Sequence, residues 1–275
     1  MNMETFKKPQ VLAVIGLLIA VAIGGAVFAF SRSSAPAEEI TNEKPAKRKI
    51  TEPVNQIDVS ERPYVEIVPL ADGRNLDLVV HAVKKDASSV EYELEYQAGT
   101  LLQGAFGLIE LQSFPSTTRL LLGSCSAGGA CTYHEDVQGG TLVLRFEGPE
   151  TYALKQEWRY FDNYGNTQSE FASKDAKFQV ESTALGKQRF VIIYNSPGYP
   201  EGLEGTVVSD PYTISSSSTL SGTAELTMRA TEEGDLTIMG YDGTDWQSFE
   251  TTTDGKTATA TVDLMKLYVV TKGLR

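Results

Sequence analysis

The two cysteines, Cys125 and Cys131, have the type and spacing that point most directly to chemistry. They flank the segment Ser-Ala-Gly-Gly-Ala, and predicted strands lie on both sides of the pair. Cysteines at the mouth of a hairpin come within disulfide distance, and the two glycines let so short a loop bend. In the exported setting argued below, nearby thiols tend to pair. The sequence therefore predicts a disulfide between Cys125 and Cys131.

A zinc site is the alternative interpretation of the same segment. Cys125, Cys131 and His134 have a C-x5-C-x2-H spacing, but structural zinc normally takes four ligands. The chain has no third cysteine, and its one other histidine is His81. We therefore expect no metal and no cofactor, and we favour the disulfide over a zinc ion or two free thiols.

Motifs for catalysis are missing from the same region. His134, Glu135 and Asp136 are adjacent, and adjacent residues of a strand point to opposite faces. Ser124 and Ser126 lie in Gly-Ser-Cys-Ser-Ala, which lacks the G-x-S-x-G nucleophile elbow. The chain contains no P-loop, dinucleotide fingerprint or D-x-D-x-D-G calcium loop. We therefore assign no catalytic residue and expect a protein that is not an enzyme.

Three glutamates with a spacing of two residues invite a metal or acid–base hypothesis. Glu91, Glu93 and Glu95 alternate with the apolar residues of the segment 90–96. In a strand this alternation places the glutamates on one face and the apolar side chains on the other. The pattern predicts the solvated outer face of a sheet rather than a catalytic site.

The chain beyond residue 63 shows period-two alternation and no long helical periodicity. We expect strands over 64–68, 76–83, 90–96, 119–122, 141–146, 152–161 and 176–181, the last two paired across the turn at 162–166. A series of short strands over about 120 residues is typical of an immunoglobulin-like β-sandwich, although the Cys–Trp–Cys signature is absent. We predict such a domain over residues 63–183.

The C-terminal part carries longer alternating segments. Residues 221–229 read SGTAELTMR, residues 236–246 read LTIMGYDGTDW, residues 257–262 read TATATV and residues 267–270 read LYVV. This pattern, over roughly residues 205–271, resembles the ZU5-like β-sandwich of bacterial surface proteins. The resemblance implies a second all-β domain, which we assign to residues 184–275. We expect Trp246, which directly follows a turn, to pack on the core of that domain.

Some ZU5-like domains cleave themselves at a His-Phe-Ser motif just before the last strand. Aligned on Tyr268, the matching positions here are Leu264, Met265 and Lys266. These residues offer neither the hydroxyl nor the imidazole that an acyl shift needs. The resemblance therefore implies a structural or interaction module without self-cleavage.

Residues 11–30 form a run of twenty residues without a charge or a strongly polar group. As a helix, such a segment spans about 30 Å, the thickness of the hydrocarbon core of a bilayer. We predict a single-pass anchor in a cell membrane behind a short cytoplasmic tail, residues 1–10. A cleaved signal peptide, cut after Ala29 or Ala37, is the alternative, but its apolar stretch usually has about 7–15 residues.

The tail is short and the cysteines form a plausible pair, which favours placing the bulk of the chain on the extracytoplasmic side. Residues 31–62 contain no aromatic residue, several prolines and scattered charges. Such a segment cannot bury enough apolar surface to offset its ordering entropy. We therefore expect a disordered linker over 31–62.

The body of the protein is strongly acidic. Residues 1–50 hold seven of the 24 basic and four of the 36 acidic groups, which leaves 17 basic and 32 acidic groups beyond residue 50. An acidic surface repels phosphate polyanions, so we expect no nucleic-acid partner.

Together these features predict an envelope protein that presents two β-sandwiches outside the membrane as a binding, adhesion or structural module. Tyr164 and Tyr199 lie in predicted loops, where an aromatic side chain can contact an envelope glycan or a protein partner. Two alternatives stay open, an exported hydrolase that uses carboxylates and an accessory subunit of an envelope complex. Buried acids paired in one cleft would favour the hydrolase.

Overall fold

The structure, a computed structural model, describes residues 50–273. The predicted tail (1–10), the predicted anchor (11–30) and most of the predicted linker lie outside the described residues. None of the helices in the part that is described has the length and apolarity needed to cross a bilayer.

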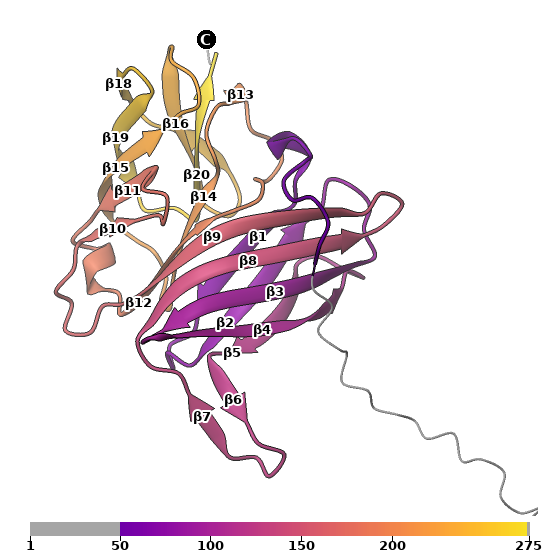
Figure 1. Cartoon of the computed structure of the whole chain (residues 1–275). Coiled ribbons are helices and arrows are strands. Elements are labelled where there is room, and N and C mark those ends of the chain that lie inside the picture. Colours follow the sequence, from indigo (N-terminus) through magenta and orange to yellow (C-terminus); the bar gives the residue numbers. More distant parts are fainter. Residues whose placement is uncertain (1–49, 274–275) are drawn as a thin grey trace, which may run out of the picture. The chain divides into compact units, whose positions relative to one another are not determined.

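The described residues form an all-β structure, as predicted, with four sheets (Figure 1). The strands of the long sheet are β3 (Ser89–Ala98), β4 (Leu101–Glu110), β8 (Val137–Glu147), β9 (Tyr152–Asp162), β12 (Phe190–Asn195), β13 (Thr206–Val207), β14 (Tyr212–Ser216), β16 (Leu236–Tyr241), β17 (Trp246–Ser248) and β20 (Leu267–Lys272). They follow the order β17-β16-β20-β14-β12-β9-β8-β3-β4, and β13 pairs with β20.

Two smaller sheets cover different parts of the long sheet. One contains β1 (Tyr64–Pro69), β2 (Asn75–Ala82) and β5 (Ser116–Leu121). The other contains β10 (Glu170–Ala172), β11 (Phe178–Glu181), β15 (Thr223–Arg229), β18 (Thr252–Asp254) and β19 (Thr257–Asp263). The short hairpin of β6 (Gly123–Cys125) and β7 (Cys131–Tyr133) projects from the lower end of the molecule in Figure 1.

Each small sheet forms a sandwich with one part of the long sheet. Period-two alternation turns Val90, Tyr92, Leu94 and Tyr96 of β3 inward, where they meet apolar residues of β1, β2 and β5. A second core lies between β10, β11, β15 and β19 and the strands β12, β14, β16 and β20. The two sandwiches therefore bury opposite faces of the same long sheet.

Strand β12 belongs to both sandwiches because its two faces are buried in different cores. Phe190, Ile192 and Tyr194 pack in the first core, and Val191 and Ile193 pack in the second. A strand that is covered on both faces has a continuous apolar sequence, here FVIIY, instead of alternation. Period-two alternation therefore does not reveal this strand.

One predicted strand pairing needs correction, and several strands were missed. Residues 176–181 do not return as the hairpin partner of β9, because β11 pairs with β10 and β15 in the other sheet while β9 pairs with β8 and β12. The chain crosses between sheets where a hairpin was expected. Strands β4, β12 and β14 were not predicted.

The predicted linker extends too far along the chain. The backbone N–H of Asn55 donates to the carbonyl of Ala153 at 2.9 Å, and its side chain bonds the backbone of Lys155. These hydrogen bonds pair backbone groups of β9 at Ala153 and Lys155, where β9 extends beyond its pairing with β12. Residues 50–62 thus lie against the body, and the boundary at 183/184 stays a prediction.

Candidate functional site

The predicted disulfide between Cys125 and Cys131 is present. The two cysteines face each other across the β6–β7 ladder, with their Cα atoms 4.0 Å apart. The alternation of a short antiparallel ladder brings the side chains of directly opposed residues together. Because both cysteines form the disulfide, neither offers a thiolate that could bind a metal. The spacing alone did not decide between the disulfide and the zinc site.

His134, the third residue of the zinc alternative, has a structural contact instead. Its Nδ1 atom lies 2.9 Å from the hydroxyl of the buried Tyr96, and its backbone N–H donates to the carbonyl of Leu122. The Arg74 guanidinium lies 4.2 Å from the centre of the Tyr133 ring. These contacts hold the base of the hairpin, and no group of three metal-binding side chains occurs among residues 50–273.

Replacing both Cys125 and Cys131 by serine is expected to lower the melting temperature by no more than about 10 °C, because the short closed loop restricts the unfolded chain little. Differential scanning calorimetry of the oxidised protein and the double variant measures the shift. The reduced wild-type protein is the matched control and should behave like the double variant. Loss of the folded state in the double variant would contradict a minor role for the bond.

The two predicted contact tyrosines lie in different environments, and the structure does not bring them together. Tyr164 is 77% exposed in the turn after β9, with the Arg189 guanidinium 5.4 Å from its ring centre. Tyr199 is half-buried and meets the Trp246 ring edge-on, at 6.3 Å between centroids. Of the two tyrosines, Tyr199 therefore belongs to a larger cluster of aromatic side chains.

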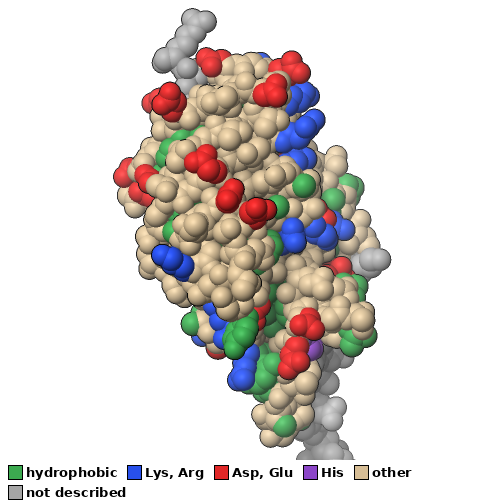
Figure 2. All heavy atoms as spheres, turned by 90° about the vertical axis from the view of Figure 1, so that its left-hand side faces the viewer, with side chains coloured by type: hydrophobic (Ala, Val, Ile, Leu, Met, Phe, Trp, Pro, Cys, Tyr) green, Lys and Arg blue, Asp and Glu red, His purple; other side chains and the backbone are tan. Residues whose placement is uncertain are grey.

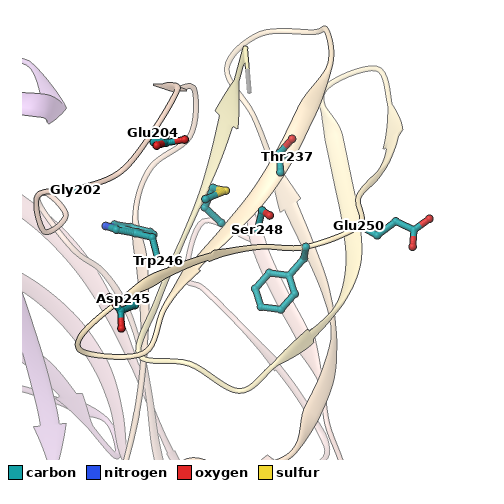
Figure 3. A pocket seen from close by; sticks show the side chains of 9 residues that line it. Gly202, Glu204, Thr237, Asp245, Trp246, Ser248 and Glu250 are labelled. Atoms are coloured by element: carbon teal, nitrogen blue, oxygen red, sulfur yellow. The ribbon is translucent and has the colours of Figure 1, made fainter. Parts of the chain in front are cut away.

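That cluster borders a cavity of about 700 Å³ at one end of the long sheet (Figure 3). The β16–β17 ladder pairs Met239 with Ser248 and Tyr241 with Trp246. Period-two alternation places these side chains and that of Thr237 on one face, and all of them except Tyr241 line the cavity. The loop after Tyr199 supplies its other wall through Gly202 and Glu204.

The Trp246 indole is fixed in place by three contacts. Its Nε1–H donates to the carbonyl of Glu201 at 3.1 Å, and the rings of Tyr199 and Tyr241 pack against it. Trp246 packs, as expected, against a small core cluster that contains Met239, Leu267 and Val269. Its ring is half-buried and also lines the cavity, because the short edge strand β17 leaves part of the ring uncovered.

The cavity carries negative charge. Glu204, Asp245 and Glu250 are exposed and line it, with the hydroxyls of Thr237 and Ser248 nearby. Figure 3 shows Glu204 and Trp246 on one side and Thr237 and Ser248 on the other, while Glu250 points away. The rigid aromatic ring and the surrounding acceptors suit a ligand with an apolar face and several hydrogen-bond donors.

The turn beside the cavity keeps its own carboxylate charged. Backbone N–H groups of Asp245 and Thr244 donate to Asp242 Oδ1 at 2.9 and 2.7 Å, and these bonds lower the pKa of the Asp242 carboxyl. The Lys84 ammonium lies 4.0 Å from the centre of the Tyr199 ring, and burial lowers the pKa of Lys84. The aromatic cluster therefore has one cation packed against it.

A second polar cluster lies where β1 meets the long sheet. The buried Glu66 accepts a hydrogen bond from the Ser215 hydroxyl at 2.7 Å, and its other oxygen lies 2.9 Å from His81 Nε2. Tyr64 stacks on the His81 ring at 4.5 Å. Glu66 thus separates the serine from the histidine, and the cluster joins β1, β2 and β14 through internal hydrogen bonds.

Glu66 is the one buried Asp or Glu among residues 50–273, so the described residues contain no pair of buried acids in one cleft. The positions aligned with the self-cleavage motif, Leu264 and Met265, are buried in the turn before β20, and Lys266 follows them. The Tyr268 hydroxyl accepts the Met265 N–H at 2.7 Å and donates to the Asp263 carbonyl at 2.5 Å. That turn is therefore held from within the second sandwich.

Most residues of the cavity are not marked by any motif in the sequence. Trp246 was noted, but Glu204 and Ser248 come from segments that only the fold brings together. A usable signal follows the tryptophan, because Gln247 and Ser248 are both polar and a fully buried strand rarely contains two consecutive polar residues.

No family model, no curated protein and no solved structure matches the chain.

Proposed function

We propose that this protein is a membrane-anchored envelope module, an immunoglobulin-like sandwich followed by a ZU5-like one, that binds a glycan without negative charge in the Trp246 cavity. The observation that carries this proposal is the fixed indole of Trp246 in a cavity edged by hydroxyls and carboxylates. A pyranose ring has an apolar C–H face that packs on an aromatic π-face, which is the negative side of the ring. Its hydroxyls donate to carboxylates.

The negative charge of the cavity limits the class of glycan that can bind there. Glu204, Asp245 and Glu250 line the cavity, and Figure 2 shows Asp and Glu side chains spread over the upper part of the face that it displays. Uronate or phosphate polymers would meet repulsion at this surface. Neutral sugars and sugars with a free amine would not, and an ammonium group gains further from nearby carboxylates and an aromatic ring.

The setting is part of the proposal. The uncharged residues 11–30 support a single-pass anchor with the bulk of the chain outside, and the disulfide of the β6–β7 hairpin supports an oxidising compartment. A shallow cavity on an exposed sheet edge suits the side of a long polymer better than a small molecule that must be enclosed.

Replacing Trp246 by alanine is expected to weaken binding of a glucosamine hexamer at least tenfold, because the stacking surface is lost. Isothermal titration calorimetry of the full chain in detergent micelles measures the affinity, with a glucose hexamer and a galacturonate hexamer as neutral and anionic probes. Trp246→Phe should retain part of the affinity. Tyr164→Ala, which removes an exposed aromatic ring elsewhere, should retain all of it.

The order of the three probes tests the charge argument separately from the stacking argument. We expect the glucosamine hexamer to bind most tightly and the galacturonate hexamer least. Equal affinity of wild type and Trp246→Ala for every probe would reject the cavity as the binding site.

A further inference from the structure

Strand β4 is an open edge of the long sheet. Within residues 50–273 it pairs only with β3. The Leu111 N–H donates to the Ser88 carbonyl in the same register, so the odd-numbered residues of β4 bond to β3. The even-numbered residues, from Leu102 to Leu108, therefore turn their N–H and C=O groups to the open side.

The same even-numbered residues carry an exposed apolar row. Leu102 is 67% exposed, Phe106 is 47% exposed and Leu108 is 53% exposed. Exposed edges are usually protected by lysine, proline or a bulge. Residues 101–110 contain no lysine, arginine or proline, and their register with β3 has no shift. This edge thus lacks the usual protection and offers backbone and side-chain contacts together.

The neighbouring strand adds unpaired negative charge on the same face. Glu91, Glu93 and Glu95 of β3 stand opposite Leu108, Phe106 and Gly104. Arg145 lies 3.5 Å from Glu91, while no cation in the described part of the chain pairs with Glu93 or Glu95. One oxygen of Glu93 is also buried without a hydrogen-bond partner there. Among the described residues, Glu93 and Glu95 of this acidic row therefore have no cation that pairs with them.

Gly104 has no side chain that would stand between the open edge and the Glu95 carboxylate. It interrupts the apolar row between Leu102 and Phe106 and stands directly opposite Glu95. A Cβ atom at this position would lie 3.0 Å from the Leu94 carbonyl oxygen and 4.0 Å from Glu95 Cγ. A long cationic side chain on an added strand can pass over the glycine and reach the Glu95 carboxylate.

We propose that β4 binds an extended segment of another protein as an additional strand, with a Lys or Arg opposite Gly104 and apolar residues two positions to either side. The main-chain groups of β4 supply affinity, and the Leu102–Gly104–Phe106 row selects the apolar–basic–apolar pattern. A second copy of this chain does not fit that pattern, because β4 itself contains no basic residue and the body is strongly acidic.

The probe is a fluorescein-labelled, end-capped peptide, Thr-Val-Thr-Lys-Thr-Val-Thr, and its control has Glu in place of Lys. Fluorescence anisotropy with the full chain in detergent micelles should show at least tenfold tighter binding of the lysine peptide. Glu95→Gln should reduce that preference at least threefold. Glu157→Gln, on the same sheet face in β9, should leave it unchanged.

Phe106→Pro removes one outward N–H within the peptide's register without removing a bond to β3, so it should abolish binding of both peptides while the melting temperature changes by only a few degrees. Equal binding of the two peptides, or full binding by Phe106→Pro, would overturn the proposal. So would a dimer that Phe106→Pro dissociates, which would make a second copy the occupant. A tenfold gain in peptide affinity after replacing Lys44, Lys47, Arg48 and Lys49 by Gln would identify the chain's own segment as the occupant instead.

Discussion

Ile192→Ala and Ile193→Ala are each expected to lower the free energy of unfolding of the whole body by about 2–5 kcal/mol. The two residues are adjacent in β12 and fully buried in different cores. Each truncation removes apolar contacts and leaves a cavity on one side of the shared strand. Because the strand links both cores, unfolding of either sandwich removes a partner from the other, and one cooperative transition is expected.

The chain contains two tryptophans, and each reports on a different half of the structure. Trp158 is buried in the first core, and Trp246 lies at the end of β16–β17 in the second half. Urea unfolding followed by fluorescence in the Trp158→Phe and Trp246→Phe backgrounds therefore monitors each half separately. Both isoleucine variants should shift both signals equally. A variant that shifted only one signal would show that the halves unfold independently.

Trp158→Ala is expected to lower the free energy of unfolding by about 3–5 kcal/mol, because it removes a large side chain from a fully buried site. The Trp158 ring meets Tyr96 edge-on at 6.3 Å, and both lie in the first core. Calorimetry or urea unfolding measures the loss. An effect below about 1 kcal/mol would mean that the site collapses around the smaller residue.

Trp158→Phe is the matched control for this site. The indole Nε1 of Trp158 is buried and has no hydrogen-bond partner among the described residues. A buried, unpaired N–H carries a desolvation penalty of about 1–3 kcal/mol, which phenylalanine avoids. We expect the phenylalanine variant to lose much less stability than the alanine variant, because the avoided penalty offsets part of the lost packing.

The sequence was sufficient where structure depends on local pattern. The alternation of 90–96 predicted both faces of β3, and the spacing of Cys125 and Cys131 predicted the disulfide, since both depend on the geometry of neighbouring residues. The turn at 162–166 also occurs where expected, with positive φ at Gly165 and Asn166. These features need no knowledge of the rest of the fold.

The sequence was insufficient where structure depends on what covers an element. Strand β12 lacks alternation because two sheets bury it, and strand β4 lacks a clear pattern because its apolar residues face solvent. The cavity was missed because Glu204 and Trp246 are brought together by the loop after Tyr199, at a distance in sequence that no local spacing records.

The order of the long sheet also determines how the molecule would carry mechanical tension. The chain joins the body beside Ala153 of β9, and a polymer held at Trp246 of β17 would pull from the far edge. The load would cross the ladders β9–β12, β12–β14, β14–β20, β20–β16 and β16–β17 in series. The β14–β20 ladder pairs Tyr212 with Tyr268 and Thr213 with Leu267 and no further residues of these strands. It is the shortest ladder of the series, so a molecule pulled between Ala153 and Trp246 should yield first at that ladder.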